Sequence, residues 1–166
     1  MLFRSQDLLQ WVHLAFTESF LSTHLRYGRK AIPGGADAYV AQWGAAVTPL
    51  GLTNPPTSEQ ELHERMAGYA PVLRVDAKTR RVIEFIKTAP LPRAARPAYR
   101  ILFWAAVDLL PPNYARMIDV RIPPRWLVRF LATAAVGAMR AIIGRTSPLE
   151  DAAVRRRHRL EHRKVG

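Results

Sequence analysis

Prolines and glycines divide this chain into segments in which apolar residues recur every three or four positions. The 166 residues include 13 prolines and 9 glycines, and the segments between them lack the strict alternation of a half-buried strand. The sequence also carries no β-hairpin signal. This pattern predicts an all-α fold, a single helical domain of about seven or eight helices. The expected helices cover residues 7–27, 37–47, 58–69, 76–86, 97–110, 113–119, 125–143 and 148–164.

Residues that cap helices define several of these boundaries. Asp7 and Asp76 can each cap the helix that follows, and Ser58 precedes Glu61 by the spacing of a capping box. Pro97 suits the first turn of the fifth expected helix, because that turn does not need the N–H that proline lacks. These signals are local, so they predict where helices begin.

Apolar spacing also predicts which side of each helix is buried. The first and fourth expected helices each carry one apolar stripe, whereas the segment 101–107 is apolar all round, which predicts burial on every side. The residues expected to face inward are Leu9, Val12, Phe16, Phe20 and Leu21 in the first helix, and Val82, Ile83 and Ile86 in the fourth.

Composition narrows the chemistry that the chain can perform. The absence of cysteine excludes disulfides, cysteine-ligated zinc and iron–sulfur centres, and cysteine nucleophiles. The formal net charge is +12, and residues 91–166 hold 15 of the 25 basic residues but 5 of the 13 acidic ones. This excess favours an anionic partner, either nucleic acid or an anionic membrane surface. The basic stretch 155–164 contains no aromatic residue, which disfavours single-stranded nucleic acid.

His13 is the first candidate for a functional side chain. It lies on the apolar side of the first expected helix, where a neutral imidazole suits a metal or haem-iron ligand. The alternative is a buried histidine that a hydrogen bond satisfies. Thr17 and His24 continue the same side, which either lines a pocket or belongs to the core. His24 is about 16 Å from His13 along the helix axis, so the two cannot bind one ion.

The other titratable residues give weaker signals. Glu18 is a lone carboxylate on a helix and is expected to be solvated, and His63, among charged neighbours, is expected to be exposed. His158 and His162 have the i, i+4 spacing of a metal site, but the surrounding arginines would repel a cation. Nothing matches a phosphate-binding glycine loop or a nucleophile elbow.

The chain carries Trp11-Val12-His13, then Ser19-Phe20-Leu21 and Arg26-Tyr27-Gly28. The order of these motifs resembles that of the MpaB-type oxygenase family, which shares its catalytic domain with the rubber oxygenases, or latex-clearing proteins. The most specific part is the helix that contains Trp11, Val12 and His13. The resemblance covers essentially the whole chain and rests on Asp7-Leu8-Leu9-Gln10-Trp11-Val12-His13, Ser19-Phe20-Leu21, Arg26-Tyr27-Gly28, Asp37-Ala38-Tyr39, Trp43, Leu50-Gly51-Leu52, Pro90-Leu91-Pro92 and Leu109-Leu110-Pro111-Pro112.

The resemblance implies an all-helical, haem b-dependent oxygenase that adds dioxygen to a small apolar substrate. His13 would then bind the haem iron, with Thr17 beside it. His24 would make a structural hydrogen bond or meet a cofactor carboxylate, and Arg26 would pair with a haem propionate or lie on the surface. Three aromatic residues would shape the helix packing and contact the macrocycle: Trp11, Phe16 and Phe20.

Family members usually carry a further stretch before the helix that contains His13. Residues 1–166 are therefore expected to be the C-terminal portion of the domain, inactive alone, with exposed apolar faces. Two other functions stay open: a basic helical module that binds nucleic acid or an anionic membrane, and a non-catalytic helical scaffold. No signal peptide or membrane span is visible, so we expect a cytoplasmic location with contact at a membrane surface.

Overall fold

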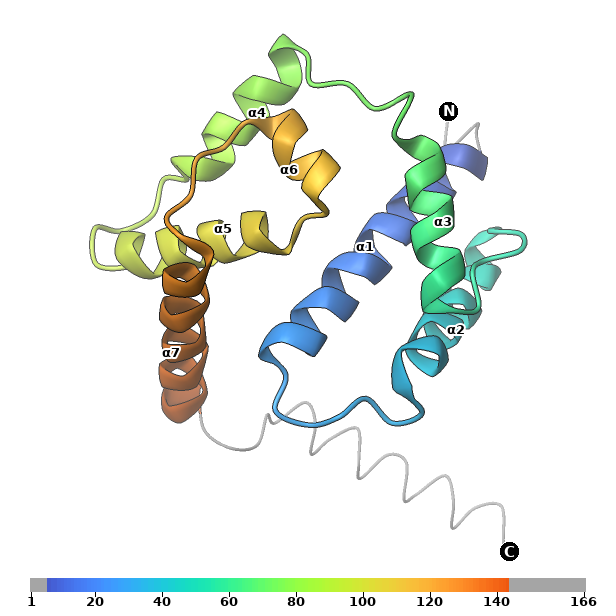
Figure 1. Ribbon diagram of the computed structural model, residues 1–166, viewed down its shortest axis with the longest axis horizontal. Helices are drawn as coiled ribbons and strands as arrows, with labels where there is room; N and C mark the ends of the chain where they lie inside the picture. The colour runs from blue at the N-terminus through green and yellow to red at the C-terminus, as the bar shows by residue number, and fades with distance from the viewer. Residues whose placement is uncertain (1–5, 144–166) are drawn as a thin grey trace, which may run out of the picture.

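Seven α-helices and one short 3-10 helix make up residues 6–143, the part of the chain that the computed structural model describes (Figure 1). These residues contain no strand, so the all-α prediction is confirmed. The basic helix expected over 148–164 lies outside the described residues. The elements are α1 (Gln6–Tyr27), α2 (Gly35–Val47), η1 (Thr48–Leu50), α3 (Glu59–Tyr69), α4 (Ala77–Lys87), α5 (Arg96–Leu109), α6 (Pro112–Ile118) and α7 (Arg125–Ile143).

The helix starts follow the capping residues, with one exception. The hydroxyl of Ser58 accepts a hydrogen bond from the Glu61 N–H at 3.2 Å, and the Asp76 carboxylate accepts one from the Thr79 N–H at 2.7 Å. Both side chains satisfy an N–H that the first turn leaves unpaired. Asp7 does not cap α1, because α1 begins at Gln6 and Asp7 lies inside its first turn. There its charge complements the helix dipole.

A first hydrophobic core forms where α1 packs against α2 and α3, which lie side by side with it in Figure 1. Its buried residues are 7% exposed or less and come from all three helices: Leu14, Leu21, Val40, Leu62 and Met66. Apolar burial on this scale contributes about 1.5–3 kcal/mol for each large side chain. This core fixes the orientation of α1.

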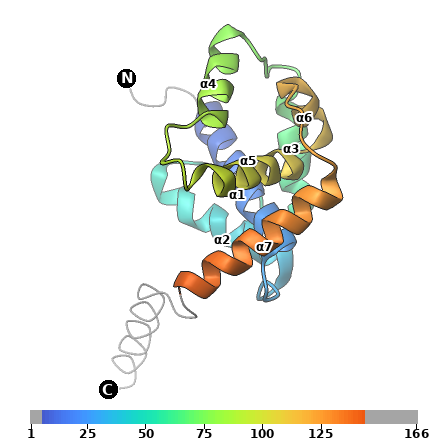
Figure 2. The same cartoon turned by 90° about the vertical axis from the view of Figure 1, so that its left-hand side faces the viewer.

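A second, smaller core joins α5 to α7, which runs obliquely to it in Figure 2. Val128 and Ala132 of α7 pack on Ala105 of α5, and Tyr27 at the end of α1 packs against them. At the edge of this core the carboxylate of Asp108 is 1% exposed. Its oxygens lie 2.8 Å from Nε of Arg125 and 2.9 Å from Nε of Arg129. The two guanidinium groups compensate the buried charge and tie α5 to α7.

Three predictions about buried faces are wrong. In α1, Phe16 and Phe20 are about half exposed, since the side that meets α2 and α3 is centred on Leu14, Thr17 and Leu21. In α4, no residue is buried, although Ile83 is less exposed than its apolar neighbours Val82 and Ile86. In α5, the segment 101–107 is not buried on every side, and Ala106 is exposed. Periodicity shows which residues share a face, whereas burial requires another element to cover that face.

Gly44 of α2 allows the loop before α3 to approach closely. A Cβ at this position would lie 3.0 Å from Cγ of Pro55 and 3.3 Å from the carbonyl oxygen of Pro56. At Gly137 of α7 a Cβ would meet nothing within 4 Å. Both glycines lie inside helices, so Gly137 is a control for the effect of adding a methyl group at Gly44.

We expect Gly44→Ala to destabilise the fold by about 1–3 kcal/mol, because the added methyl group overpacks this contact. Gly137→Ala is expected to stabilise it by about 0.5–1 kcal/mol, since alanine has the higher helix propensity. Urea unfolding followed by circular dichroism measures both. A Gly44→Ala variant as stable as Gly137→Ala would contradict the close approach.

Candidate functional site

His13 lies in the part of α1 that faces the first core. Its side chain is buried, at 3% exposure, and Thr17 one turn later is fully buried. The Thr17 hydroxyl lies 3.4 Å from Nδ1 of His13, a long contact that orients the ring. Nε2 of His13 is buried and has no hydrogen-bond partner among the described residues. A buried polar atom without a partner is unusual and calls for an explanation.

Burial lowers the pKa of His13 below its ordinary value of 6.5, and the positive charge of Arg65 lowers it further. The imidazole is therefore neutral around pH 7, so one ring nitrogen keeps its lone pair. Neutral imidazole is the form that binds a metal or haem iron. The structure thus places His13 and Thr17 together as the sequence predicted, and Nε2 forms no hydrogen bond with any residue of the described range 6–143.

His24 and Arg26 lie at the other end of α1. Nε2 of His24 lies 3.0 Å from the carbonyl oxygen of Lys30, which is the structural hydrogen bond that the sequence left open as an alternative. Arg26 is exposed and makes no hydrogen bond or ion pair within residues 6–143. The structure therefore does not bring these two side chains to His13.

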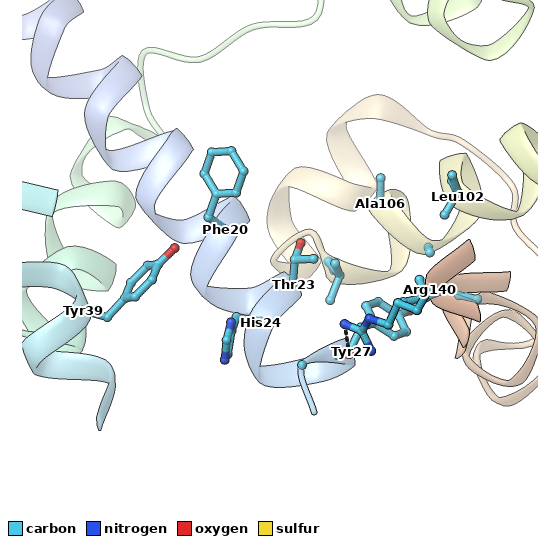
Figure 3. Close-up of a pocket in the computed structure, with 13 residues that line it drawn as sticks. Phe20, Thr23, His24, Tyr27, Tyr39, Leu102, Ala106 and Arg140 are labelled. Carbon is cyan, nitrogen blue, oxygen red and sulfur yellow. Dashed lines mark hydrogen bonds between the residues drawn. The ribbon is translucent and has the colours of Figure 1, made fainter. Parts of the chain in front are cut away.

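His24 lines a cavity of about 380 Å³ that α1, α2, α5 and α7 enclose (Figure 3). At its mouth Nη2 of Arg140 donates a hydrogen bond to the carbonyl oxygen of Tyr27 at 3.2 Å. The Tyr27 hydroxyl is buried and has no hydrogen-bond partner in the described part of the chain. Burial together with the charge of Asp108 raises its pKa. Apart from Arg140, the wall from α5 and α7 is apolar and includes Leu102, Ala106 and Val136.

A row of aromatic rings follows the exposed side of α1 next to this cavity. Phe16 stacks on Phe20 with 6.1 Å between ring centroids, and Phe20 stacks on Trp43 of α2 at 5.5 Å. Trp11 does not join them, because its ring packs against Tyr69 at 5.2 Å and Tyr114 at 6.3 Å. Of the three aromatic residues that the resemblance assigns to the macrocycle, Trp11 therefore lies apart from the other two.

Glu18 corrects the expectation of a solvated carboxylate. Its side chain is 11% exposed and accepts a hydrogen bond from the Ser22 hydroxyl at 2.6 Å. Its other oxygen lies 2.8 Å from Nε2 of His63, whose side chain is half exposed, so the prediction of an exposed His63 holds. Sequence spacing alone could not show this pair, because 45 residues separate the two side chains.

Residues 6–143 contain no cluster of three or more His, Cys, Asp or Glu side chains that could hold a metal ion. A haem iron needs one protein donor, and the neutral, unpartnered Nε2 of His13 fits that requirement. Neither of the two cavities beside α1 is lined by His13, so side chains over Nε2 would have to move to admit a cofactor.

None of the described helices is both long and apolar enough to cross a membrane. The proposed pair His158 and His162 lies outside the described residues.

The sequence model of a family described as "ER-bound oxygenase mpaB/B'/Rubber oxygenase, catalytic domain" matches residues 4–141. This match spans most of the chain, so the protein belongs to this family of oxygenase catalytic domains. The resemblance predicted from the sequence is therefore confirmed. No curated protein and no solved structure matches the chain.

The lowered pKa of His13 predicts how stability depends on pH. Between its folded value and about 6.5 the unfolded chain binds a proton that the folded chain does not, so stability falls as the pH is lowered through this window. Above about pH 6.5 this contribution no longer changes. We expect the Tm of the wild type to fall more than that of His13→Gln between about pH 8 and about pH 5. Parallel Tm curves for the two proteins would contradict a buried neutral His13.

Proposed function

We propose that this protein is a haem b-dependent oxygenase that adds dioxygen to a small apolar substrate, with His13 as the residue that would bind the iron. The observation that carries the proposal is the buried Nε2 of His13, which has no partner within the described residues of an oxygenase family member. An unsatisfied buried nitrogen costs about 1–3 kcal/mol, so a bound metal offers a physical reason for keeping it.

The chain's own residues would hold and orient the cofactor. Haem b supplies the iron at which dioxygen is activated when it is bound. Thr17 is the positioning residue, because its contact with Nδ1 fixes the ring of His13. Phe16 and Phe20 present half-exposed, parallel rings on the neighbouring face of α1, where a flat apolar macrocycle would bury them. His24 and Arg26 lie at the far end of α1 from His13. Their proposed role is therefore limited to binding a carboxylate group of the haem that extends to that end of the helix.

Reconstitution with haemin tests the ligand. In the wild type we expect the Soret band to be shifted from its position in free haemin. His13→Ala should abolish this shift. Thr17→Val should lower the affinity for haemin about tenfold. His24→Ala is the matched control for iron ligation, since it removes a histidine about 16 Å away on the same helix. It should leave the position of the band unchanged, whatever its effect on haemin affinity. Far-ultraviolet circular dichroism verifies that each variant is folded. An identical Soret spectrum for wild type and His13→Ala would overturn the assignment.

We further propose that α4 rests on an anionic membrane surface. Its apolar side chains Val82 and Phe85 are 56% and 65% exposed, and Ile86 is 44% exposed. The same helix carries four basic residues against one acidic residue: Lys78, Arg80, Arg81 and Lys87 against Glu84. An uncovered apolar face on a basic amphipathic helix is typical of helices that lie in the interface of anionic bilayers.

Vesicle binding tests this surface. We expect the protein to bind vesicles that contain phosphatidylserine and to release them as salt increases. Phe85→Ser should weaken binding about tenfold, because burying a phenylalanine contributes about 1.5–3 kcal/mol. Phe130→Ser in α7, which changes a ring of similar exposure (67%), is the matched control and should bind as the wild type does. Equal binding by both variants, or binding to duplex DNA and not to vesicles, would contradict the proposal.

A further inference from the structure

A second cavity, of about 440 Å³, lies between α1, α3, α5 and α6 and the segment 73–75. Apolar side chains form most of its wall, among them Trp11, Met66, Leu109, Leu110, Met117 and Ile118. An apolar cavity of this size with a few polar groups is typical of a binding site for a small molecule. Its polar lining comes mainly from one side of α1, with Glu18, Ser19, Ser22 and Thr23, and is completed by Arg74 and by Thr79 of α4.

Glu18 is the buried polar group of this cavity. Ser22 donates to one carboxylate oxygen at 2.6 Å, and His63 lies 2.8 Å from the other. An ionised carboxylate offers about four acceptor positions, so these two partners leave acceptor capacity for a ligand. The partners also hold the carboxylate in place, because Ser22 reaches it from the next turn of α1 and His63 reaches it from α3.

Glu18 places a carboxylate at the border of an apolar wall. A carboxylate beside apolar side chains loses hydration, and its partners offset that loss in part. An apolar residue would pack against Trp11 and Met66 without this cost. The half-exposed ring of His63 lies between the carboxylate and solvent. Glu18 therefore has a polar neighbour, although most of the side chains that line the cavity are apolar.

This cavity is separate from the environment of His13. Trp11, Ala15 and Ser22 line it and share one face of α1, since they are spaced by four and eleven residues. His13 follows Trp11 by two residues, which places it about 200° further round the helix. A ligand in this cavity therefore does not depend on haem or on His13.

We propose that the cavity binds an apolar molecule whose head group is a hydrogen-bond donor, an alcohol or a primary amine, which donates to the carboxylate of Glu18. The apolar wall accepts the hydrocarbon part, and the remaining acceptor positions of Glu18 accept the head group. A carboxylate head group is disfavoured beside Glu18, because the two negative charges would repel each other. The cation that lines the cavity, Arg74, is an exposed residue of the segment 73–75, whereas Glu18 is buried.

Competition for a fluorescent probe tests this assignment on the cofactor-free protein. Nile red, a neutral dye, is bound first and then displaced by decanol, decylamine or decanoate below their micelle concentrations. In the wild type we expect decanol and decylamine to displace the dye at concentrations at least tenfold lower than decanoate. Glu18→Gln should reduce this ratio about tenfold, because the amide both donates and accepts and carries no charge. Glu64→Gln, an exposed position of α3 outside the cavity, should keep the wild-type ratio.

A second variant keeps the test valid if Glu18→Gln does not fold. Ala15 lines the cavity through its small side chain, so Ala15→Phe should fill the space and weaken all three compounds and the dye together. Equal displacement by the three compounds in the wild type would overturn the proposal. So would an unchanged ratio in folded Glu18→Gln, or wild-type binding by Ala15→Phe. These measurements involve no haem, so their outcome is independent of that of the haemin experiment.

Discussion

The structure depends on the burial of one side of α1 against α2 and α3. Leu14 and Leu21 lose nearly all contact with solvent there, together with Val40 and Leu62 from the partner helices. Because this contact fixes the rotation of α1 about its axis, it also decides what the remaining sides of the helix face. One of these sides borders the cavity that Glu18 lines. Another borders the cavity next to α7 and carries Phe20, whose half-exposed ring stacks on that of Phe16.

His13 and Glu18, two buried titratable side chains five residues apart on α1, differ in how the fold accommodates them. His13 stays neutral, because burial and the charge of Arg65 lower its pKa, and its Nε2 has no partner in the described residues. Glu18 instead has a partner at each oxygen, Ser22 on its own helix and His63 on α3. An unpartnered neutral nitrogen suits a ligand that brings a Lewis acid, whereas a held carboxylate suits a ligand that brings a donor.

The other half of the described chain is less completely covered. Asp108 joins α5 to α7 through Arg125 and Arg129, so two of the arginines that give the second half its positive charge act within the fold. Outside this contact, Phe85 of α4 and Trp126 and Phe130 of α7 remain more than 60% exposed. Large exposed apolar side chains beside basic ones favour contact with a further surface. The charge of this region therefore has two roles, one inside the fold and one outside it.

The sequence by itself determined where the helices lie and to which family the chain belongs. Caps such as Ser58 and Asp76, and prolines such as Pro97, act on the backbone within one turn, so their effects can be predicted without knowledge of the fold. The motif that contains His13 consists of adjacent residues, so it too can be recognised without knowledge of the fold. The burial of His13 followed from its place on an apolar stripe, although the centre of that stripe was predicted wrongly.

The tertiary structure alone decided which faces are covered and which distant side chains meet. Periodicity placed Phe16, Phe20 and Val82 on apolar faces, but the packing of the helices leaves these side chains about half exposed. Periodicity also predicted that Glu18 would be solvated. In the structure, His63 of α3, 45 residues away in the sequence, contacts Glu18. Residues of α5 and α6 line a cavity beside this carboxylate. The reason is physical: helix formation is governed by neighbours within about four residues, whereas burial and hydrogen bonding between helices depend on how whole helices pack.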